Sequence, residues 1–143
     1  DISDDALAVA EENGKKLSLD HRVAWRKGDY LTALEEGEVF DGILTNPPYI
    51  PSGDIPGLQK EVQHEPALAL DGGKDGLDFY RKLADSAASH LKDGGFLAME
   101  FGIHQADEVR KLFEDSGDYD SFEIIKDYGG IERALYCRKK ENE

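Results

Sequence analysis

The chain has 143 residues, of which 34% are charged and 39% hydrophobic, and its formal net charge is −14. This length fits one globular domain with a core of its own. No apolar run approaches the roughly 18 residues of a membrane span and no signal-peptide pattern is visible, so we expect no membrane association. An acidic chain repels a phosphate backbone, so nucleic acid is disfavoured as the substrate and a protein partner with a basic surface is favoured. A high negative charge can also simply keep a protein in solution.

The chain has a single cysteine, Cys137, which cannot form an internal disulfide. Such cysteine usage is typical of a reducing cytoplasm, where we expect the protein to be found. Cys137 ends the apolar run 134–137, and this setting indicates a structural thiol. His64 stands in no metal-ligand or nucleophile pattern, so it is interpreted as a surface residue and no metal site is predicted.

The amino-terminal part predicts a helix followed by a strand. Ser3 precedes two aspartates and is typical of a helix N-cap with acids in the first turn. Apolar residues at helical spacing then continue to Asn13-Gly14 or slightly beyond. Residues 22–26 predict a short strand that ends in the Lys-Gly-Asp-Tyr sequence 27–30.

The stretch Asn46-Pro-Pro-Tyr49 follows residues 39–44, an apolar segment typical of a buried strand. Two consecutive prolines cannot continue a sheet, so the strand must stop at Asn46. A side-chain amide is thereby placed at the carboxyl end of a strand, where open α/β sheets bind their ligands.

This stretch is suited to hold a planar NH2 group by its two hydrogens. The side-chain oxygen of Asn46 and the carbonyl oxygen of Pro47 can each accept one N–H bond, while Tyr49 packs against the flat group. Pro47 and Pro48 have no N–H, so the turn presents carbonyl oxygens and leaves the bound nitrogen open to an electrophile. The alternative is an ordinary Asn-Pro turn at the end of a strand.

The rest of the chain alternates between helices and strands, which indicates an α/β fold. The connection 52–74 is rich in Gly, Pro and Asp, and a connection of this length is usually functional, so we expect it to form a lip beside the substrate. In chain order, the later elements are a helix from about Asp75 to Leu91 ended by 93–95, a buried strand over 96–101, a helix around 106–113 that closes near Gly117, and a hairpin of 122–126 with 133–137.

The Asn-Pro-Pro-Tyr stretch after a short strand resembles the signature of S-adenosylmethionine-dependent methyltransferases that act on amino groups. Its continuation is similar to the protein-glutamine N5-methyltransferases that modify peptide-chain release factors. That similarity runs from Asp1 to about Arg138 and is carried by the segments 46–51, 58–62, 65–70, 72–73 and 75–81.

The resemblance implies a Rossmann-like class I methyltransferase sheet of strand order 3-2-1-4-5-7-6 with a carboxyl-terminal antiparallel hairpin. We expect a partial methyltransferase domain over 1–138 and a frayed tail over 139–143. No glycine-rich turn of the G-x-G-x-x-G kind occurs in the chain, and the family's helical recognition domain is absent. We therefore expect a carboxyl-terminal fragment that lacks the first strand, the glycine-rich turn and most of the second strand. We expect this fragment to bind the donor poorly and to have little activity. Its unpaired sheet edges would allow it to self-associate.

The resemblance also implies which residues bind the methyl donor. The carboxylate of Asp1 would accept hydrogen bonds from the ribose hydroxyls, and that of Asp29 would accept one from the adenine amine. Tyr30 would pack near the adenine, and Asn46 would face the methyl group. A frayed terminus at Asp1 and a plain Gly-Asp turn with a buried tyrosine are the alternatives.

On the acceptor side, the resemblance implies that Asn46, Pro47 and Tyr49 are catalytic and that Pro48 shapes the same pocket. Glu65 would order this pocket by hydrogen bonding, or else be a solvated turn residue.

The implied function is methyl transfer to the side-chain amide nitrogen of a glutamine in a release factor, a reaction of translation termination in the cytoplasm. One alternative is methylation of an exocyclic amine of DNA or RNA, reached by base flipping. Another is a non-catalytic binding fragment.

Overall fold

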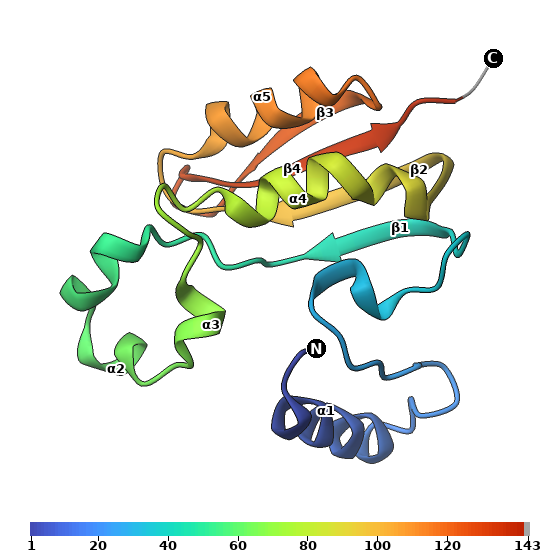
Figure 1. Cartoon of the computed structure of the whole chain (residues 1–143), viewed down its shortest axis with the longest axis vertical. Helices are drawn as coiled ribbons and strands as arrows, with labels where there is room; N and C mark the ends of the chain where they lie inside the picture. Colours follow the sequence, from blue (N-terminus) through green and yellow to red (C-terminus); the bar gives the residue numbers. More distant parts are fainter. Residues whose placement is uncertain (142–143) are drawn as a thin grey trace. The chain divides into compact units, whose positions relative to one another are not determined.

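The computed structural model describes residues 1–141 (Figure 1). The chain divides into two compact units, Asp1–Glu38 and Val39–Glu143, of which residues 142 and 143 lie outside the described part. The single domain expected over 1–138 stays a prediction. Within residues 1–141, none of the helices has the length and apolar character needed to cross a membrane.

The first unit begins with helix α1, Asp4–Lys16. The hydroxyl oxygen of Ser3 accepts from the backbone N–H of Ala6 at 3.2 Å, which satisfies one of the free donors at the helix start. Aspartates lie in the first turn and lysines in the last, in the order that suits the helix dipole. The predicted helix is confirmed, and a short 3-10 helix η1, Tyr30–Ala33, follows later in this unit.

The strand predicted over 22–26 is wrong, because these residues adopt no regular structure. A strand needs a neighbour to satisfy its N–H and C=O groups, and no described strand pairs with this segment. Its side chains are held differently: Trp25 packs so closely on α1 that a Cβ atom at Gly14 would lie 2.7 Å from its ring. Arg26 binds both carboxyl oxygens of Glu38, at 2.5 and 2.8 Å.

The second unit is built on a four-stranded sheet of order β1-β2-β4-β3. β1 runs parallel to β2, whereas β4 is antiparallel to both β2 and β3. This order matches the 4-5-7-6 part of the expected sheet, and it confirms the carboxyl-terminal hairpin. The strands are β1 (Phe40–Thr45), β2 (Leu91–Glu100), β3 (Tyr119–Lys126) and β4 (Glu132–Lys139).

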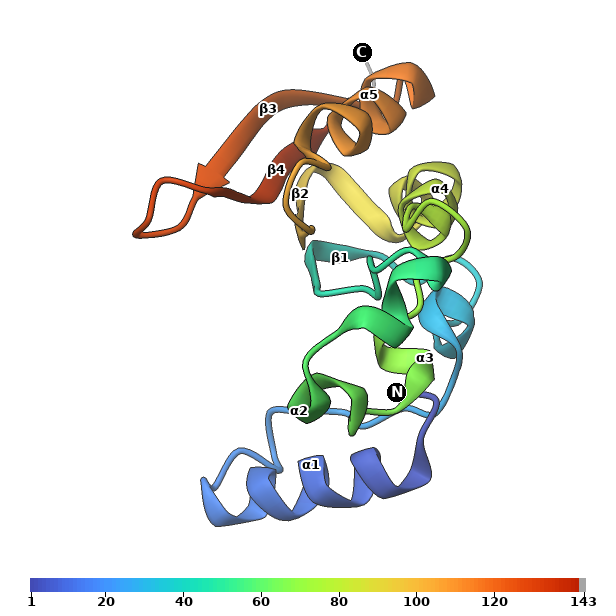
Figure 2. The ribbon, with the colours of Figure 1, turned by 90° about the vertical axis from the view of Figure 1, so that its left-hand side faces the viewer.

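Helices α4 (Asp78–Ser86) and α5 (Ala106–Ser116) cover one face of this sheet (Figure 2). Both helices are amphipathic and place apolar residues at three- and four-residue spacing toward the strands. α5 ends at Gly117 as predicted, and this glycine adopts the left-handed conformation. The core between helices and sheet contains Tyr80, Leu83, Leu97, Met99, Val109, Phe113, Leu135 and Cys137.

Helix α4 is shorter than the predicted helix, which was expected to reach Leu91. The α-helix ends at Ser86, a 3-10 turn η3 (Ala87–His90) follows, and β2 already begins at Leu91. The reason is pairing with β1, because Leu91 aligns with Phe40 and draws the chain into the sheet. The register then shifts so that Gly42 aligns with Phe96, and the residues between form an irregularity in the strand.

The connection after β1 contains three short helical turns: η2 (Ser52–Gly57), α2 (Lys60–Gln63) and α3 (Ala67–Leu70). Its role as a lip stays a prediction. At the other end of the chain, the predicted tail begins too early, since Lys139 belongs to β4 and aligns with Tyr119. β1 and β3 are the edges of the described sheet, and self-association through them also stays a prediction.

Candidate active site

The polar turn that follows β1 leaves two hydrogen-bond acceptors without partners. Asn46 is exposed, and its side-chain amide makes no hydrogen bond to any residue of the described range 1–141. Pro47 is buried, and its carbonyl oxygen likewise accepts no hydrogen bond within that range. The structure therefore leaves free the two oxygens that the sequence singled out for holding an NH2 group.

Tyr49 is anchored to the loop that follows β2. Its half-buried ring lies over Gly102, where an added Cβ atom would come within 2.9 Å of Tyr49 Cδ2. Its carbonyl oxygen accepts a hydrogen bond from Gln105 Nε2 at 3.0 Å, and Gln105 Oε1 accepts from the N–H of Gly102 at 2.8 Å. Gln105 is only 8% exposed. We did not identify this residue from the sequence, since its partner Tyr49 lies 56 positions away.

A second contact braces the turn from the other side. Ile50 forms a parallel bridge with Asp71, in which Ile50 N donates to Leu70 O at 3.1 Å and Gly72 N donates to Ile50 O at 2.8 Å. Gly76 has a φ of +79°, and a Cβ atom there would clash with the carbonyl oxygen of Tyr49. Glycine is thus required at this position both for its backbone conformation and for space.

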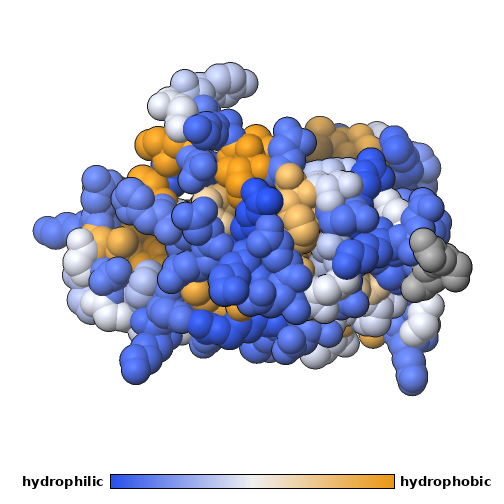
Figure 3. Space-filling view, turned by 90° about the horizontal axis from the view of Figure 1, so that it is seen from above, coloured by the Kyte–Doolittle hydropathy of each residue, from blue (hydrophilic) through white to orange (hydrophobic). Residues whose placement is uncertain are grey.

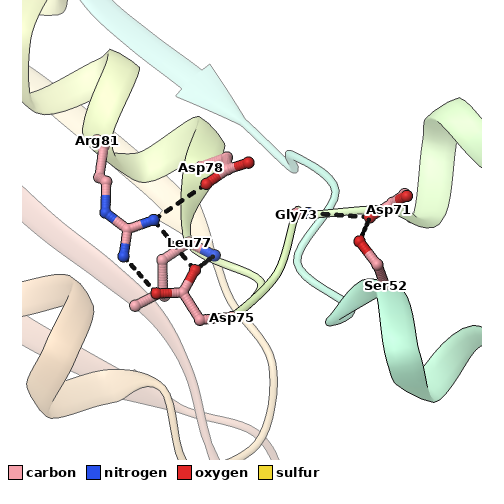
Figure 4. A network of polar contacts seen from close by, with 7 residues as sticks. All are labelled: Ser52, Asp71, Gly73, Asp75, Leu77, Asp78 and Arg81. Atoms are coloured by element: carbon pink, nitrogen blue, oxygen red, sulfur yellow. Dashed lines mark hydrogen bonds and ion pairs between the residues drawn. The ribbon is translucent and has the colours of Figure 1, made fainter.

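Polar contacts fix the same loop at both ends (Figure 4). The Ser52 hydroxyl donates to Asp71 Oδ1 at 2.6 Å and the N–H of Gly73 donates to the same oxygen at 2.9 Å, so the pKa of Asp71 lies below its ordinary value. These bonds tie the start of η2 to the residue that follows α3.

Farther along the loop, Arg81 of α4 binds both carboxyl oxygens of Asp75 and also pairs with Asp78 (Figure 4). Hydrogen bonding from Arg81 lowers the pKa of Asp75 to about 2, with a smaller contribution from the N–H of Leu77, which donates to Asp75 Oδ1 at 3.1 Å. Asp75 thus lies ahead of α4 and closes the turn before the helix rather than occupying its N-cap.

Three of the residues predicted to bind the donor, namely Asp1, Asp29 and Tyr30, lie in the first unit. The amino group of Asp1 donates to Arg26 O at 2.8 Å, its carboxylate accepts from Ser3 N at 2.8 Å, and its carbonyl accepts from Gly28 N at 3.0 Å. These bonds place Asp1 beside the segment that leads to Asp29, whose carboxylate is exposed. Tyr30 follows with a φ of +62°, which is unusual for a residue with a side chain.

Glu65, predicted to order the acceptor pocket, lies exposed between α2 and α3. Its carboxylate makes no hydrogen bond or ion pair within the described residues, and nothing there joins it to Asn46 or Tyr49. Its role stays a prediction. His64 beside it is also exposed.

A separate hollow lies between the loop after β2 and the turn of the hairpin. It is lined by Ile103, His104, Lys126, Gly130, Ile131 and Glu132, and none of the predicted site residues contributes to it. Ile103 and Ile131 remain 47% and 41% exposed. On the face shown in Figure 3, apolar side chains interrupt a largely hydrophilic surface.

Comparisons of sequence identify close relatives of the chain, although no protein-family model matches it. A release factor glutamine methyltransferase from Moorella thermoacetica is 45% identical over 141 residues, which are 99% of this chain and 50% of that protein. Another from Caulobacter vibrioides is 48% identical over 136 residues, 94% of this chain and 46% of that protein. The chain spans about half the length of the curated relatives that it matches.

Solved structures share the fold at lower identity. A methyltransferase from Pyrococcus furiosus superposes with a TM-score of 0.70 at 20% identity, covering 98% of this chain and 60% of that one. A SAM-dependent O-methyltransferase from Thermotoga maritima gives 0.61 at 14% identity, covering 96% and 47%. These likenesses concern the fold alone and confirm the predicted class I methyltransferase architecture. Over nearly its whole length, the chain is similar in sequence to release factor glutamine methyltransferases.

Proposed function

We propose that the protein carrying this chain transfers a methyl group from S-adenosylmethionine to the side-chain amide nitrogen of a glutamine in a peptide-chain release factor. Such a reaction would serve translation termination in the cytoplasm. The observation that carries the proposal is the pair of unpartnered oxygens at the end of β1, those of the Asn46 side chain and the Pro47 carbonyl. The sequence similarity to release factor glutamine methyltransferases supports the acceptor class.

These two oxygens meet the chemical need of an amide acceptor. An amide nitrogen is a poor nucleophile, because its lone pair is delocalised into the carbonyl group. When Asn46 and Pro47 accept hydrogen bonds from both hydrogens of the amide, they orient its nitrogen toward the incoming methyl carbon. The two oxygens also stabilise the positive charge that develops on the nitrogen during transfer. Tyr49 packs against the flat carboxamide, and Pro48 keeps the turn rigid.

Donor binding is assigned to the exposed carboxylates of the first unit. When bound, S-adenosylmethionine supplies a methyl group on a positively charged sulfur, which departs as a neutral thioether. Asp1 and Asp29 each keep a carboxylate oxygen free of hydrogen bonds and ion pairs within the described residues, which suits the hydroxyl and amine groups of a nucleoside. Tyr30 is the neighbouring aromatic residue, and Asn46 would face the methyl group.

No general base is assigned to this site. The nitrogen needs no deprotonation before the methyl group moves, since the proton that remains on it afterwards is strongly acidic and leaves to water. Catalysis would therefore depend on position and on the two acceptor oxygens.

A methyl-transfer assay of the protein that carries this chain tests the proposal. Purified protein is incubated with labelled S-adenosylmethionine and either a release factor or an oligonucleotide. We expect label in the release factor and loss of transfer by about a hundredfold or more in Asn46→Ala, while Asn13→Ala, on exposed α1, serves as the matched control. Label in the oligonucleotide alone would instead establish methylation of a base amine, and label in neither would leave a binding role.

A further inference from the structure

A single buried side chain, that of Gln105, joins the two loops that form the candidate active site. Gln105 precedes α5 and stands at its N-cap position, yet its side chain makes no capping bond to the helix. It reaches instead to the carbonyl oxygen of Tyr49 after β1 and to the N–H of Gly102 after β2. A polar side chain that is 8% exposed, with one bond inside its own loop and one to the other loop, holds its neighbours in a fixed arrangement.

The chemistry of the two partners specifies the side chain. The N–H of Gly102 can only donate and the carbonyl of Tyr49 can only accept, so the residue between them must offer one acceptor and one donor. A neutral carboxamide of glutamine length meets both needs in one orientation. A carboxylate would turn an oxygen toward Tyr49 O, and an aliphatic side chain would leave both backbone groups without these partners.

A displacement of Tyr49 would also displace the acceptor oxygens of Asn46 and Pro47. The prolines at 47 and 48 have fixed φ angles, so few soft torsions separate the Tyr49 carbonyl from the Pro47 carbonyl and the Asn46 side chain. On its other side, the Tyr49 carbonyl abuts Gly76, which leaves no room for a compensating shift in that direction.

We infer that Gln105 is a positioning residue, which holds Tyr49 so that the oxygens of Asn46 and Pro47 keep the geometry needed to bind the acceptor amide. This inference rests on the proposed function for its effect on methyl transfer. Its structural content, the anchoring of the turn, can be measured without any acceptor.

The decisive variant is Gln105→Glu, which keeps the size and the acceptor oxygen of the side chain, replaces the donor to Tyr49 by an oxygen and adds a negative charge. Asn13→Asp, at an exposed position of α1, introduces the same change in charge elsewhere. Both are made in the full-length protein that carries this chain. The rate constant kcat and the KM for the release factor are measured well below the unfolding temperature, together with the Kd of S-adenosylmethionine.

A positioning role predicts that Gln105→Glu lowers kcat by about tenfold to a hundredfold, while the Kd of S-adenosylmethionine stays within about twofold of the wild type. Asn13→Asp should match the wild type in both. A kcat for Gln105→Glu equal to that of Asn13→Asp would overturn the inference. So would a loss of activity that merely follows the folded fraction, as a purely structural role requires.

Hydrogen exchange provides the readout that is independent of the acceptor. In Gln105→Glu, the Ile50 N–H, which bonds to Leu70, should exchange about tenfold faster than in the wild type, whereas that of Leu135 in β4 should be unchanged. Unchanged exchange at Ile50 would overturn the inference whatever the activity. Faster exchange in a protein whose wild type methylates no release factor would refute the proposed function and still support the anchoring of the turn.

Discussion

The ring of Tyr49 lies against the backbone of Gly102, at a distance that leaves no room for a side chain between them. This contact brings the loop after β1 onto the loop after β2, at the ends of two adjacent parallel strands. Ligand sites of open α/β sheets are found at this edge. The proposed acceptor turn is thus held by the fold of the second unit itself.

Gly102→Ala should damage the site through this contact. The new Cβ atom would lie 2.9 Å from Tyr49 Cδ2 and must displace the ring. We expect a loss of about 1–3 kcal/mol in the free energy of unfolding, measured by urea denaturation, and a fall in methyl transfer. Gly57→Ala is the control, because nothing lies within 4 Å of the Cβ position there. Equal unfolding midpoints for the two variants would contradict the close contact.

Two buried tyrosines should respond in opposite ways to the loss of their hydroxyl groups. The hydroxyl of Tyr80, a fully buried residue, donates to the Glu100 carbonyl at 2.6 Å, and burial raises the pKa of this phenol. Tyr80→Phe should therefore cost about 1–2 kcal/mol, since it leaves a carbonyl at the end of β2 unpaired.

The hydroxyl of Tyr119 is also buried but has no hydrogen-bond partner among residues 1–141. Tyr119→Phe should be neutral or stabilising, because it removes a hydroxyl group that is desolvated in the folded protein and gains no hydrogen bond in return. The free energies of unfolding of both variants, obtained from the same urea titration, provide the test. Equal losses would mean that the Tyr80 bond contributes nothing specific.

The ion pair between Asp75 and Arg81 should make stability depend on pH in a defined window. The pKa of Asp75 falls from 3.8 to about 2 in the folded state, chiefly through Arg81. A lowered pKa means that the contribution is fully present above about pH 4 and is lost as the pH falls toward 2. Because the Asp75 side chain is 49% exposed, we expect less than about 1 kcal/mol.

Urea midpoints measured between pH 5 and pH 2 would reveal this contribution. Asp75→Asn should flatten the acid slope of the unfolding free energy, whereas Asp85→Asn, an exposed change on the same helix, should keep the wild-type slope. An identical slope in the wild type and in Asp75→Asn would show that the pair is absent in solution.

Cys137 should be unreactive in the folded protein. The residue is fully buried on β4, and burial raises the pKa of its thiol to about 12, with a smaller contribution from the charge of Asp120. Since the thiolate is the reactive form, labelling by a thiol reagent at pH 8 should be at least about a hundredfold slower than in urea. Rapid labelling of the folded protein would contradict the packing of Cys137 in the core.

The sequence predicted the elements whose signals are local. Consecutive prolines at 47 and 48 ended β1 as expected, Gly117 ended α5, and the apolar alternation on either side of the turn near Gly129 predicted the hairpin. Each of these signals arises from the backbone preference of one residue or from a pattern within a few residues.

Errors arose where a distant contact decided the structure. The alternation around Trp25 is equally compatible with a strand and with packing on α1, and only the absence of a described partner strand distinguishes them. Leu91 keeps helical spacing with Leu83 and Ala87, yet pairing with Phe40 places it in β2. Gln105 carries no local signal, since its role is set by the folded position of Tyr49.

The most direct test of the central claim is the mass of the peptide that contains the acceptor glutamine, after the release factor is incubated with S-adenosylmethionine and the full-length protein that carries this chain. The account predicts a gain of one methyl group on the glutamine side-chain nitrogen with the wild type. It also predicts almost none with Asn46→Ala. Equal methylation by Asn46→Ala, or a methyl group on any atom other than an amide nitrogen, would contradict the assignment of the turn after β1 as the acceptor site.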